Sequence, residues 1–457
     1  MKIVRLRNIA LSAFSGYLFV ALFLVAFVPR LVYVSLQERG SGLILDGEME
    51  RAAASWASKS RIADVYGPGT GDSAHVAPLY PIFLGYIYRF FGPTTINAKV
   101  CQQILAVMAS SAAIGLLPFI AVRLCLGLWC GIMAGVALAL SPMYLWVETA
   151  GGWEQPYAAL SLQGILLVFI SLHQRAWLSW QLAVAGGILV GTSCLLCASV
   201  LPVVVLLLLA EVVSQRRNLR PLISPVLQLT GIAVLVILPW TCRNYLVLGG
   251  IVPIRSNWGL ELAVGNHSQS NGRTYTTEVN DRTTPIRRIH SHPFSSEQER
   301  KKVMLLGELR YMAEKAEIAK QWIREHPWAF LKLTAQRFML FCFPPPDMWP
   351  ASSPVKGLKS ALMTIAGACG LLGIIRLCMI RHPYSLILVS VLLGFSLPYM
   401  ITHVDLRYRY PLNWLIFLLA FDLLLSGFRR YRQSGACRNL RQSAFLDKGS
   451  KLIIEES

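Results

Sequence analysis

The sequence predicts an all-α integral membrane protein: a polytopic helical bundle with about ten spans and outer-face loops that carry short amphipathic helices. Hydrophobic residues fill 54% of its 457 positions and charged residues only 15%, whereas a soluble domain carries about a quarter charged residues. The mean hydropathy is +0.51. Several uncharged runs reach the roughly 20 residues that a helix needs to cross a bilayer, among them 9–28, 100–122 and 221–242.

The apolar runs define the spans one by one. The ten predicted spans lie at roughly 9–28, 100–122, 126–147, 154–172, 178–196, 198–213, 222–246, 357–378, 383–402 and 411–428. The stretch 176–210 contains no charged residue, but it is too long for one straight crossing at about 1.5 Å per residue, so we divide it near Cys197. The segment 328–343 contains Lys332 and Arg337, and we therefore expect an interfacial or partly embedded helix there.

The charge distribution predicts the orientation. The formal net charge of +19 comes from 43 Lys and Arg residues against 24 Asp and Glu residues. These cations are scattered among the spans instead of forming one face, which argues against a nucleic-acid-binding protein. Every second connection is basic, and because basic connections stay in the cytoplasm, we expect a multi-pass protein of the inner (plasma) membrane with both ends cytoplasmic. The remaining cations suit membrane lipids with anionic head groups, or phosphate substrates.

This topology divides the chain into four parts. Residues 1–246 form an N-terminal membrane module, whose first outer loop covers about 29–99. Residues 247–356 form an outer-face region with soluble and interfacial helices. Residues 357–428 contain the C-terminal spans, and residues 429–457 form a basic cytoplasmic tail.

Within the outer-face region we expect one soluble helix over 296–325. It is opened by a capping box at Ser295 and Gln298 and stopped by Pro327. The run His290-Ser291-His292 is expected to be exposed to solvent and not to bind a metal. No cysteine spacing typical of a metal site is present, and no Walker motif, Gly-rich dinucleotide turn or Ser-His-Asp order stands in a context that would support it.

The first outer loop carries two acidic residues, Asp46 and Glu48, in an otherwise apolar neighbourhood near the membrane surface. A carboxylate there can act as a general base toward a bound hydroxyl or amine, a role worth about 10²–10⁴-fold in rate. Alternatively, the two acids cap an amphipathic helix over 49–59, because the macrodipole favours negative charge at a helix N-terminus. His75 and Pro78-Leu79-Tyr80-Pro81 follow, and the apolar-aromatic run after them is expected to lie along the interface with Tyr80 at head-group depth. We expect Glu48, His75 and Tyr80 to contribute to binding the substrate.

Charged residues also lie at the outer-face ends of two later spans. Glu154 lies where the fourth span begins, and together with the first-loop acids it can share a divalent cation, since hard oxygen ligands suit Mg²⁺ or Mn²⁺. The alternative is a merely solvated acid. Arg243 and Arg255, after the seventh span, can hold a phosphate by charge-assisted hydrogen bonds or simply anchor the chain to lipid phosphates.

The last outer-face connection between two spans is the segment 403–411. Its charged and aromatic residues, which include Arg407, Tyr408 and Arg409, are denser than anchoring requires, so we expect them to contribute to a substrate-binding site. Asp422 lies inside the last span toward its cytoplasmic end. A charged residue is costly there, and we expect a structural hydrogen bond instead of a proton relay.

Taken in order, these segments resemble the membrane glycosyltransferases of the GT-C superfamily, in particular the bacterial protein mannosyltransferase and lipid A aminoarabinose transferase group (glycosyltransferase family 39-like). Each match is weak alone, but the set runs in the family's order across nearly the whole chain. The matching pieces are Asp46 with a small residue eight positions later (Ala54), Pro78-Leu79-Tyr80-Pro81 with Phe91-Gly92, Trp153-Glu154-Gln155-Pro156, Pro239-Trp240 with Arg243-Asn244-Tyr245, His326-Pro327 and Arg407-Tyr408-Arg409-Tyr410-Pro411. The family's usual Tyr four residues after the aspartate is Glu50 here, and its basic residue between the fifth and sixth spans is absent.

The resemblance implies a polyprenyl-phosphate-dependent sugar transferase with no certain cofactor. Its acceptor is a lipid, a glycan or a protein at the outer face. Asp46 matches the catalytic aspartate that deprotonates the acceptor, so the reaction inverts the anomeric carbon and releases polyprenyl phosphate. Arg243, Arg255 and Arg407 become candidates for stabilising that phosphate, and Glu154 matches an acidic position that helps to bind a metal or substrate in some members.

Two other readings stay open at this point. A transporter or flippase of lipid-linked saccharides would place charged groups along its spans and break helices near mid-membrane. A scaffold protein would leave the first-loop acids and the Arg407 segment without a purpose. Because most of the charges lie at the outer-face ends of the spans, the sequence favours a reaction at the membrane–water interface.

Overall fold

The computed structural model describes residues 2–37, 47–149, 151–175, 179–216, 219–273, 292–349 and 355–428, with the side chains of 2–15 and 175 excluded. Within these ranges the chain is almost entirely helical, and β-structure is limited to two isolated bridges, Ala63 with Asp72 and Arg273 with Val404. The predicted all-α class is confirmed.

Among the described residues, six helical stretches are long and apolar enough to cross a membrane. They are Gly16–Leu36 in α1 (Lys2–Leu36), Ile96–Arg123 (α4, Ile96–Gly115, with α5, Leu117–Arg123), Gln155–Gln174 in α8 (Gln155–Arg175), α11 (Arg220–Leu248), α17 (Lys356–Met379) and Leu406–Phe428, which begins with α19 (Leu406–Arg409) and η2 (Tyr410–Leu412). Four shorter apolar helices are α6 (Leu128–Ala139), α9 (Trp180–Leu196), α10 (Val200–Ser214) and α18 (Ser385–Ile401). All ten overlap the predicted spans, while the number that actually cross the membrane stays a prediction.

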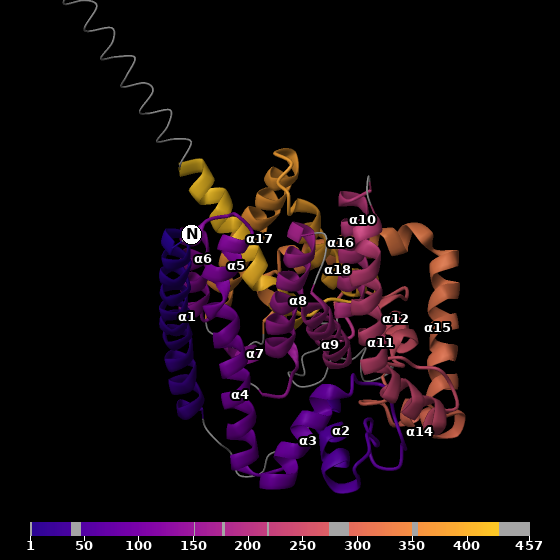
Figure 1. Cartoon of the computed structure of the whole chain (residues 1–457). Coiled ribbons are helices and arrows are strands. Elements are labelled where there is room, and N and C mark those ends of the chain that lie inside the picture. The colour runs from indigo at the N-terminus through magenta and orange to yellow at the C-terminus, as the bar shows by residue number, and fades with distance from the viewer. Residues whose placement is uncertain are drawn as a thin grey trace, which may run out of the picture.

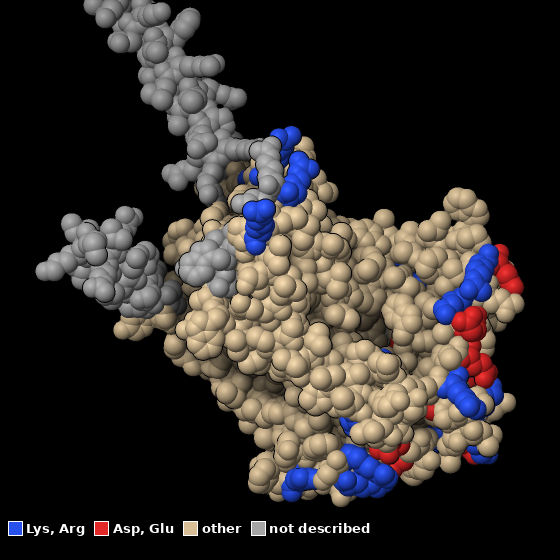
Figure 2. Space-filling model, turned by 45° about the vertical axis from the view of Figure 1, so that its right-hand side comes forward, with Lys and Arg blue, Asp and Glu red and all other residues tan. Residues whose placement is uncertain are grey.

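The helices are arranged with two distinct ends (Figure 1). The labelled N-terminal end of the chain and the last part of the final helix lie at one end. Helices α2 (Glu48–Lys59), α3 (Leu79–Phe91) and α14 (Glu297–Leu306) lie at the opposite end, which we call the loop end. On the face drawn in Figure 2, charged side chains gather at the two ends and along one edge, and a broad uncharged area separates them. Such an area fits a membrane-embedded belt.

Helices α9 and α11 approach closely through glycine. A Cβ atom on Gly187 would lie 2.7 Å from the Cβ of Ile232, and one on Gly191 would lie 2.7 Å from the Cβ of Val236. The two glycines are four residues apart, so they lie on one face of α9 and form the small-xxx-small spacing that lets helices pack tightly in a membrane.

Two short helices build the first loop. α2 begins with Glu48 and Glu50 in its first turn, as the helix macrodipole favours, and it confirms the predicted amphipathic helix. α3 follows the same loop and packs on α2, where Gly85 leaves no room for a side chain against Trp56. Together these helices fix the positions of the residues that lie between them.

The outer-face region contains two helices where the sequence predicts one. α14 ends at Gly307, whose φ of 76° is a conformation that glycine adopts readily, and α15 covers Glu308–Glu325. The cap is also shifted by one residue, because Ser296 and not Ser295 accepts the backbone N–H of Glu299, at 3.3 Å. The predicted stop is confirmed, and α16 (Pro327–Cys342) begins there.

Glu299 ties α14 to α15 and makes this region sensitive to acid. Its carboxylate contacts Lys315 Nζ at 2.6 Å and Lys302 Nζ at 2.9 Å, and it accepts a hydrogen bond from the Tyr311 hydroxyl at 2.7 Å. Burial opposes ionisation, but these donors outweigh it and lower the pKa of Glu299 to about 2. A lowered pKa stabilises the fold above the unfolded value of about 4.3, and this contribution is lost as the pH falls toward 2.

We therefore expect Glu299→Gln to lower the stability of this region at pH 7 by up to about 3 kcal/mol. Between about pH 4.5 and 2, the stability of the variant should depend less on pH than that of the wild type. Thermal unfolding in detergent, followed by circular dichroism across that range, measures both effects. The matched control is Glu297→Gln, because Glu297 is exposed on the same helix turn. An unchanged acid transition in Glu299→Gln would contradict the assignment.

Candidate functional site

A cavity of about 590 Å³ opens at the loop end. Its walls come from α2, residues 152–155, the α9–α10 connection, α12 (Trp258–Gly265), residues 292–294 and residues 398–408. One part is charged, lined by Glu48, Glu50, Lys99, Glu154, Arg255, Glu261, His292, His403 and Arg407. Another part is largely apolar, lined by Cys197, Ala198, Leu201, Pro202, Pro398 and Tyr399. A cavity with this division suits an amphiphile with a polar head group.

Five of the predicted site residues line this cavity together. They are Glu48, Glu154, Arg255, Arg407 and Tyr408. They come from four separate segments of the chain, so folding brings them together from far apart in sequence. Asp46, the predicted catalytic residue, lies outside the described residues, but Gly47 and Glu48, which follow it directly, line the cavity.

The two cavity arginines are held by neighbouring groups. Arg255 donates from Nε to the backbone oxygen of His75 at 2.8 Å, so the first loop fixes its position. The guanidinium of Arg407 lies over the Trp153 ring, 5.2 Å from its centroid, and Arg407 Nη2 donates to the Tyr408 hydroxyl at 3.5 Å. Arginine held in this way presents a planar set of donors that suits phosphate oxygens.

Three other predicted site residues do not line the cavity but hydrogen-bond to the backbone of nearby segments. Arg243 donates to the backbone oxygens of Ser73 and Ile62, both at 2.9 Å, and pairs with Asp72 at 3.1 Å. Tyr80 donates its hydroxyl to the backbone oxygen of Gly151 at 2.5 Å. Arg409 is buried and donates to the backbone oxygens of Cys342 and Met363, at 2.9 and 3.0 Å. These contacts hold the first loop, the second loop and α16 in place.

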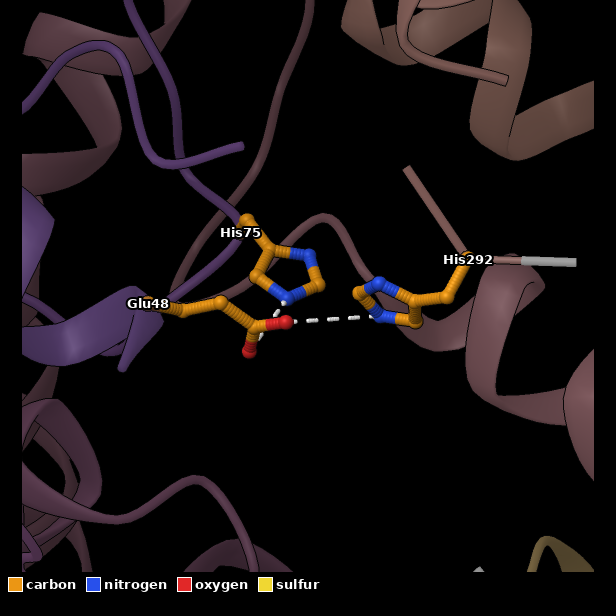
Figure 3. Close-up of side chains that lie close together, drawn as sticks. All are labelled: Glu48, His75 and His292. Atoms are coloured by element: carbon orange, nitrogen blue, oxygen red, sulfur yellow. Dashed lines mark hydrogen bonds and ion pairs between the residues drawn. The ribbon is translucent and has the colours of Figure 1, made fainter. Parts of the chain in front are cut away.

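A buried cluster joins the first loop to the segment before α14 (Figure 3). His75 Nε2 lies 3.2 Å from Glu48 Oε2, and His292 Nε2 lies 3.5 Å from Glu48 Oε1. His75 Nδ1 is 2.7 Å from the Tyr66 hydroxyl. The expectation that His292 is exposed is wrong, since it is only 3% exposed and packs against the rings of His75 and Tyr66. His290 lies outside the described residues.

Glu261 is a further cavity acid, which the sequence prediction missed. It accepts a hydrogen bond from Asn257 at 2.7 Å and lies 3.6 Å from His403 Nε2. Burial would raise its pKa, but His403, His292, His75 and Arg255 outweigh burial, and the net shift is downward. Glu261 is therefore ionised at neutral pH. The available signal was a single acid in the otherwise apolar helix α12.

No family model matches this chain, and no curated protein sequence matches it significantly. Solved structures do match. The archaeal oligosaccharyltransferase AglB from Archaeoglobus fulgidus, in complex with an inhibitory peptide and a dolichol-phosphate, aligns with a TM-score of 0.56 and 12% identity over 93% of this chain. An Archaeoglobus fulgidus oligosaccharyltransferase in complex with Zn and sulfate aligns with a TM-score of 0.54 and 14% identity, also over 93% of this chain.

The chain spans about half the length of the solved structures that it matches, 52% and 50% respectively. At this level of identity, the likeness establishes the fold. The helical arrangement is therefore the fold of the archaeal oligosaccharyltransferases that it matches.

Proposed function

We propose that this protein is an inverting membrane glycosyltransferase. It moves a sugar from a polyprenyl-phosphate donor to an acceptor at the outer face of the inner (plasma) membrane, with both chain ends in the cytoplasm. The observation that carries the proposal is the cavity, in which two arginines and several carboxylates adjoin an apolar part between α10 and α18. The GT-C fold and the dolichol-phosphate bound to AglB are consistent with this donor class.

In this proposal Asp46 is the general base. It takes the proton from the acceptor nucleophile, whose lone pair attacks the anomeric carbon. The bond from that carbon to the phosphate oxygen breaks, and polyprenyl phosphate leaves with the bonding electrons. Arg255 and Arg407 neutralise the charge that develops on the leaving phosphate, the kind of electrostatic stabilisation that contributes most in a water-poor site.

The other cavity residues take supporting roles. We assign Glu48 and Tyr408 to binding the substrate, His75 to holding Glu48, and Glu154 to contributing a carboxylate oxygen to a divalent cation such as Mg²⁺ or Mn²⁺. Arg243, Tyr80 and Arg409 act as positioning residues, because their polar atoms contact the backbone of the loops and of α16.

The competing function is a transporter or flippase of lipid-linked saccharides. Charged residues do occur within the described apolar helices, and several of them form pairs. Arg30 contacts Glu148, His173 contacts Glu211, and Arg376 contacts Asp422. Paired charges of this kind serve as structural contacts, and the cavity's charged residues gather at the loop end, which favours a reaction there.

The test uses purified protein in detergent with a panel of polyprenyl-phosphate sugars, and it follows the release of free polyprenyl phosphate. Release by the wild type identifies the donor. We expect Arg255→Ala and Arg407→Ala to slow release by about 10²–10³-fold, while Arg61→Ala, a change at an exposed arginine of the first loop, leaves it unchanged. Saturable binding of a lipid-linked sugar without release from any donor would support the transporter instead.

A further inference from the structure

The cluster of Glu48, His75 and His292 has the arrangement of a metal site. Each residue offers one ligand atom, and the three atoms lie within 4.8 Å of one another. The two histidine–carboxylate separations are 3.2 and 3.5 Å. Four ligands at zinc bond lengths of about 2.0–2.1 Å form a tetrahedron with edges of about 3.3 Å. Both separations are close to this length, although they go to different oxygens of Glu48, so the carboxylate must turn to offer one oxygen to the metal.

We propose that Glu48, His75 and His292 bind a zinc ion whose fourth coordination position faces the cavity. Both imidazoles are almost fully buried, with side chains 0% and 4% exposed, and Glu48 is 17% exposed. Glu48 and His292 also line the cavity. Three protein ligands with one open position are typical of zinc ions that bind a water molecule or a substrate oxygen.

The chemistry of the ligands narrows the choice of metal. Two imidazole nitrogens and one carboxylate oxygen suit zinc and also Fe²⁺, whereas Mg²⁺ and Mn²⁺ prefer oxygen ligands. This site is separate in composition from the oxygen-based cation site assigned to Glu154. Glu261 is a second acid close to His75 and His292, so the local charge also favours a cation.

Tyr66 supports the ligand role of His75. Its hydroxyl lies 2.7 Å from His75 Nδ1, and the tyrosine is 1% exposed. When Nδ1 carries the ring proton and donates it to the Tyr66 oxygen, Nε2 has a lone pair directed to the cluster. A hydrogen-bond partner of this kind fixes the tautomer of a metal-binding histidine and orients its ring.

His292 must change its tautomer when the metal binds. Its Nδ1 accepts the backbone N–H of Phe294 at 3.2 Å, so a neutral His292 without metal carries its proton on Nε2 and donates to Glu48. With zinc on Nε2, the proton moves to Nδ1 and the Phe294 hydrogen bond breaks. The metal replaces the Phe294 hydrogen bond and the two histidine–carboxylate contacts with three coordination bonds.

The first experiment measures zinc in the purified full-length protein. The protein is stripped with a chelator, reloaded, and analysed for metal content after gel filtration, and its affinity is measured by competition with a chromophoric chelator. We expect one zinc per chain that millimolar Mg²⁺ does not displace. Co²⁺ in place of zinc should give the intense visible absorption of a tetrahedral site, a signal that needs no variant. The absence of stoichiometric zinc and of this Co²⁺ spectrum would overturn the proposal.

Variants then test the ligand set. His292→Ala and His75→Ala should abolish stoichiometric zinc, and Tyr66→Phe should weaken binding by about 10- to 100-fold. The matched control is His403→Ala, which removes another buried histidine that lines the same cavity beside a glutamate, and it should keep wild-type zinc. Wild-type affinity in His292→Ala would overturn the assignment. The readout is metal content, so the result is independent of whether the protein transfers sugar.

Discussion

Asp46→Asn should slow sugar transfer by about 10²–10⁴-fold and leave the fold and donor binding largely intact. The amide has nearly the shape of the carboxylate but cannot take the proton from the acceptor. The next two residues, Gly47 and Glu48, line the cavity, so the change is made beside the charged part of the cavity. Initial rates of polyprenyl phosphate release, with donor binding measured separately, give the two effects.

The matched control for this variant is Asp64→Asn. Asp64 is a carboxylate of the same loop, but it pairs with Lys59 on the surface at 2.7 Å and does not line the cavity, so transfer should be unaffected. Near-normal transfer in Asp46→Asn would remove Asp46 as the base. A loss of donor binding of the same size as the loss of rate would make it a binding residue instead.

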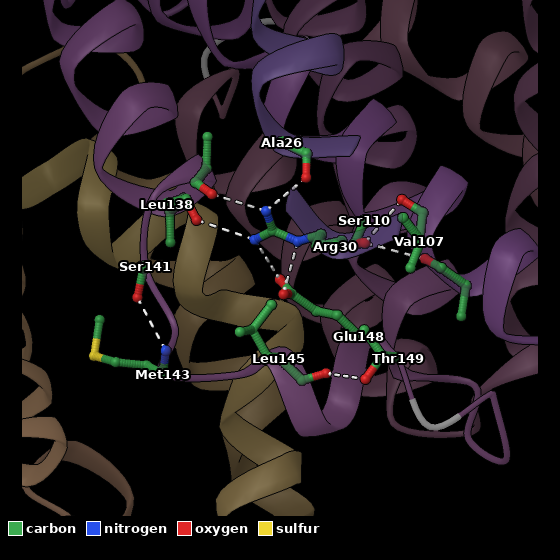
Figure 4. Close-up of polar contacts among 12 residues, drawn as sticks. Ala26, Arg30, Val107, Ser110, Leu138, Ser141, Met143, Leu145, Glu148 and Thr149 are labelled. Atoms are coloured by element: carbon green, nitrogen blue, oxygen red, sulfur yellow. Dashed lines mark hydrogen bonds and ion pairs between the residues drawn. The ribbon is translucent and has the colours of Figure 1, made fainter. Parts of the chain in front are cut away.

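Arg30→Ala should destabilise the protein by about 3–5 kcal/mol, the usual cost of removing one partner of a buried ion pair. Arg30 is 1% exposed on α1 and contacts Glu148 of α7 (Leu145–Glu148) through Nε at 2.8 Å and Nη2 at 3.2 Å (Figure 4). It also donates to the backbone oxygens of Ala26, Leu138 and Ala139. Its removal leaves the buried carboxyl group of Glu148 without its cationic partner. Thermal unfolding in detergent or in lipid nanodiscs measures the loss.

A double variant separates the lost charge pair from the lost packing. Arg30→Met combined with Glu148→Gln removes both charges, and the glutamine can still accept the hydrogen bond that Tyr410 donates to position 148. We expect it to recover much of the stability. Lys320→Ala, which breaks an exposed pair on α15, should change the melting temperature little. Equal destabilisation in the single and double variants would show that packing, and not the buried charge, dominates.

Local sequence patterns predicted the helices well, because burial in lipid requires long uncharged runs. The ten predicted spans, the helix over 49–59 and the stop at Pro327 all correspond to helices or helix ends. Asp422 was expected to make a structural contact, and it pairs with Arg376 at 2.6 Å. Each of these features depends on residues that are close in sequence or on the cost of an isolated charge in lipid.

The site was predicted only in part, because its remaining contacts connect distant segments. The segment that contains His292 is polar, which suggested exposure, yet it is buried by Tyr66 and His75 from more than 200 positions earlier. Arg30 and Glu148 are 118 residues apart, and nothing near either one signals the other. In the same way, the sequence could not separate Arg255, which lines the cavity, from Arg243, which holds the first loop.

The cavity's last wall comes from residues 398–408, whereas its first wall begins at Gly47. A nascent chain that has not yet reached residue 398 therefore contains most of the helices but lacks this last wall of the cavity. If the proposed function holds, sugar transfer should therefore begin only after this segment has been inserted.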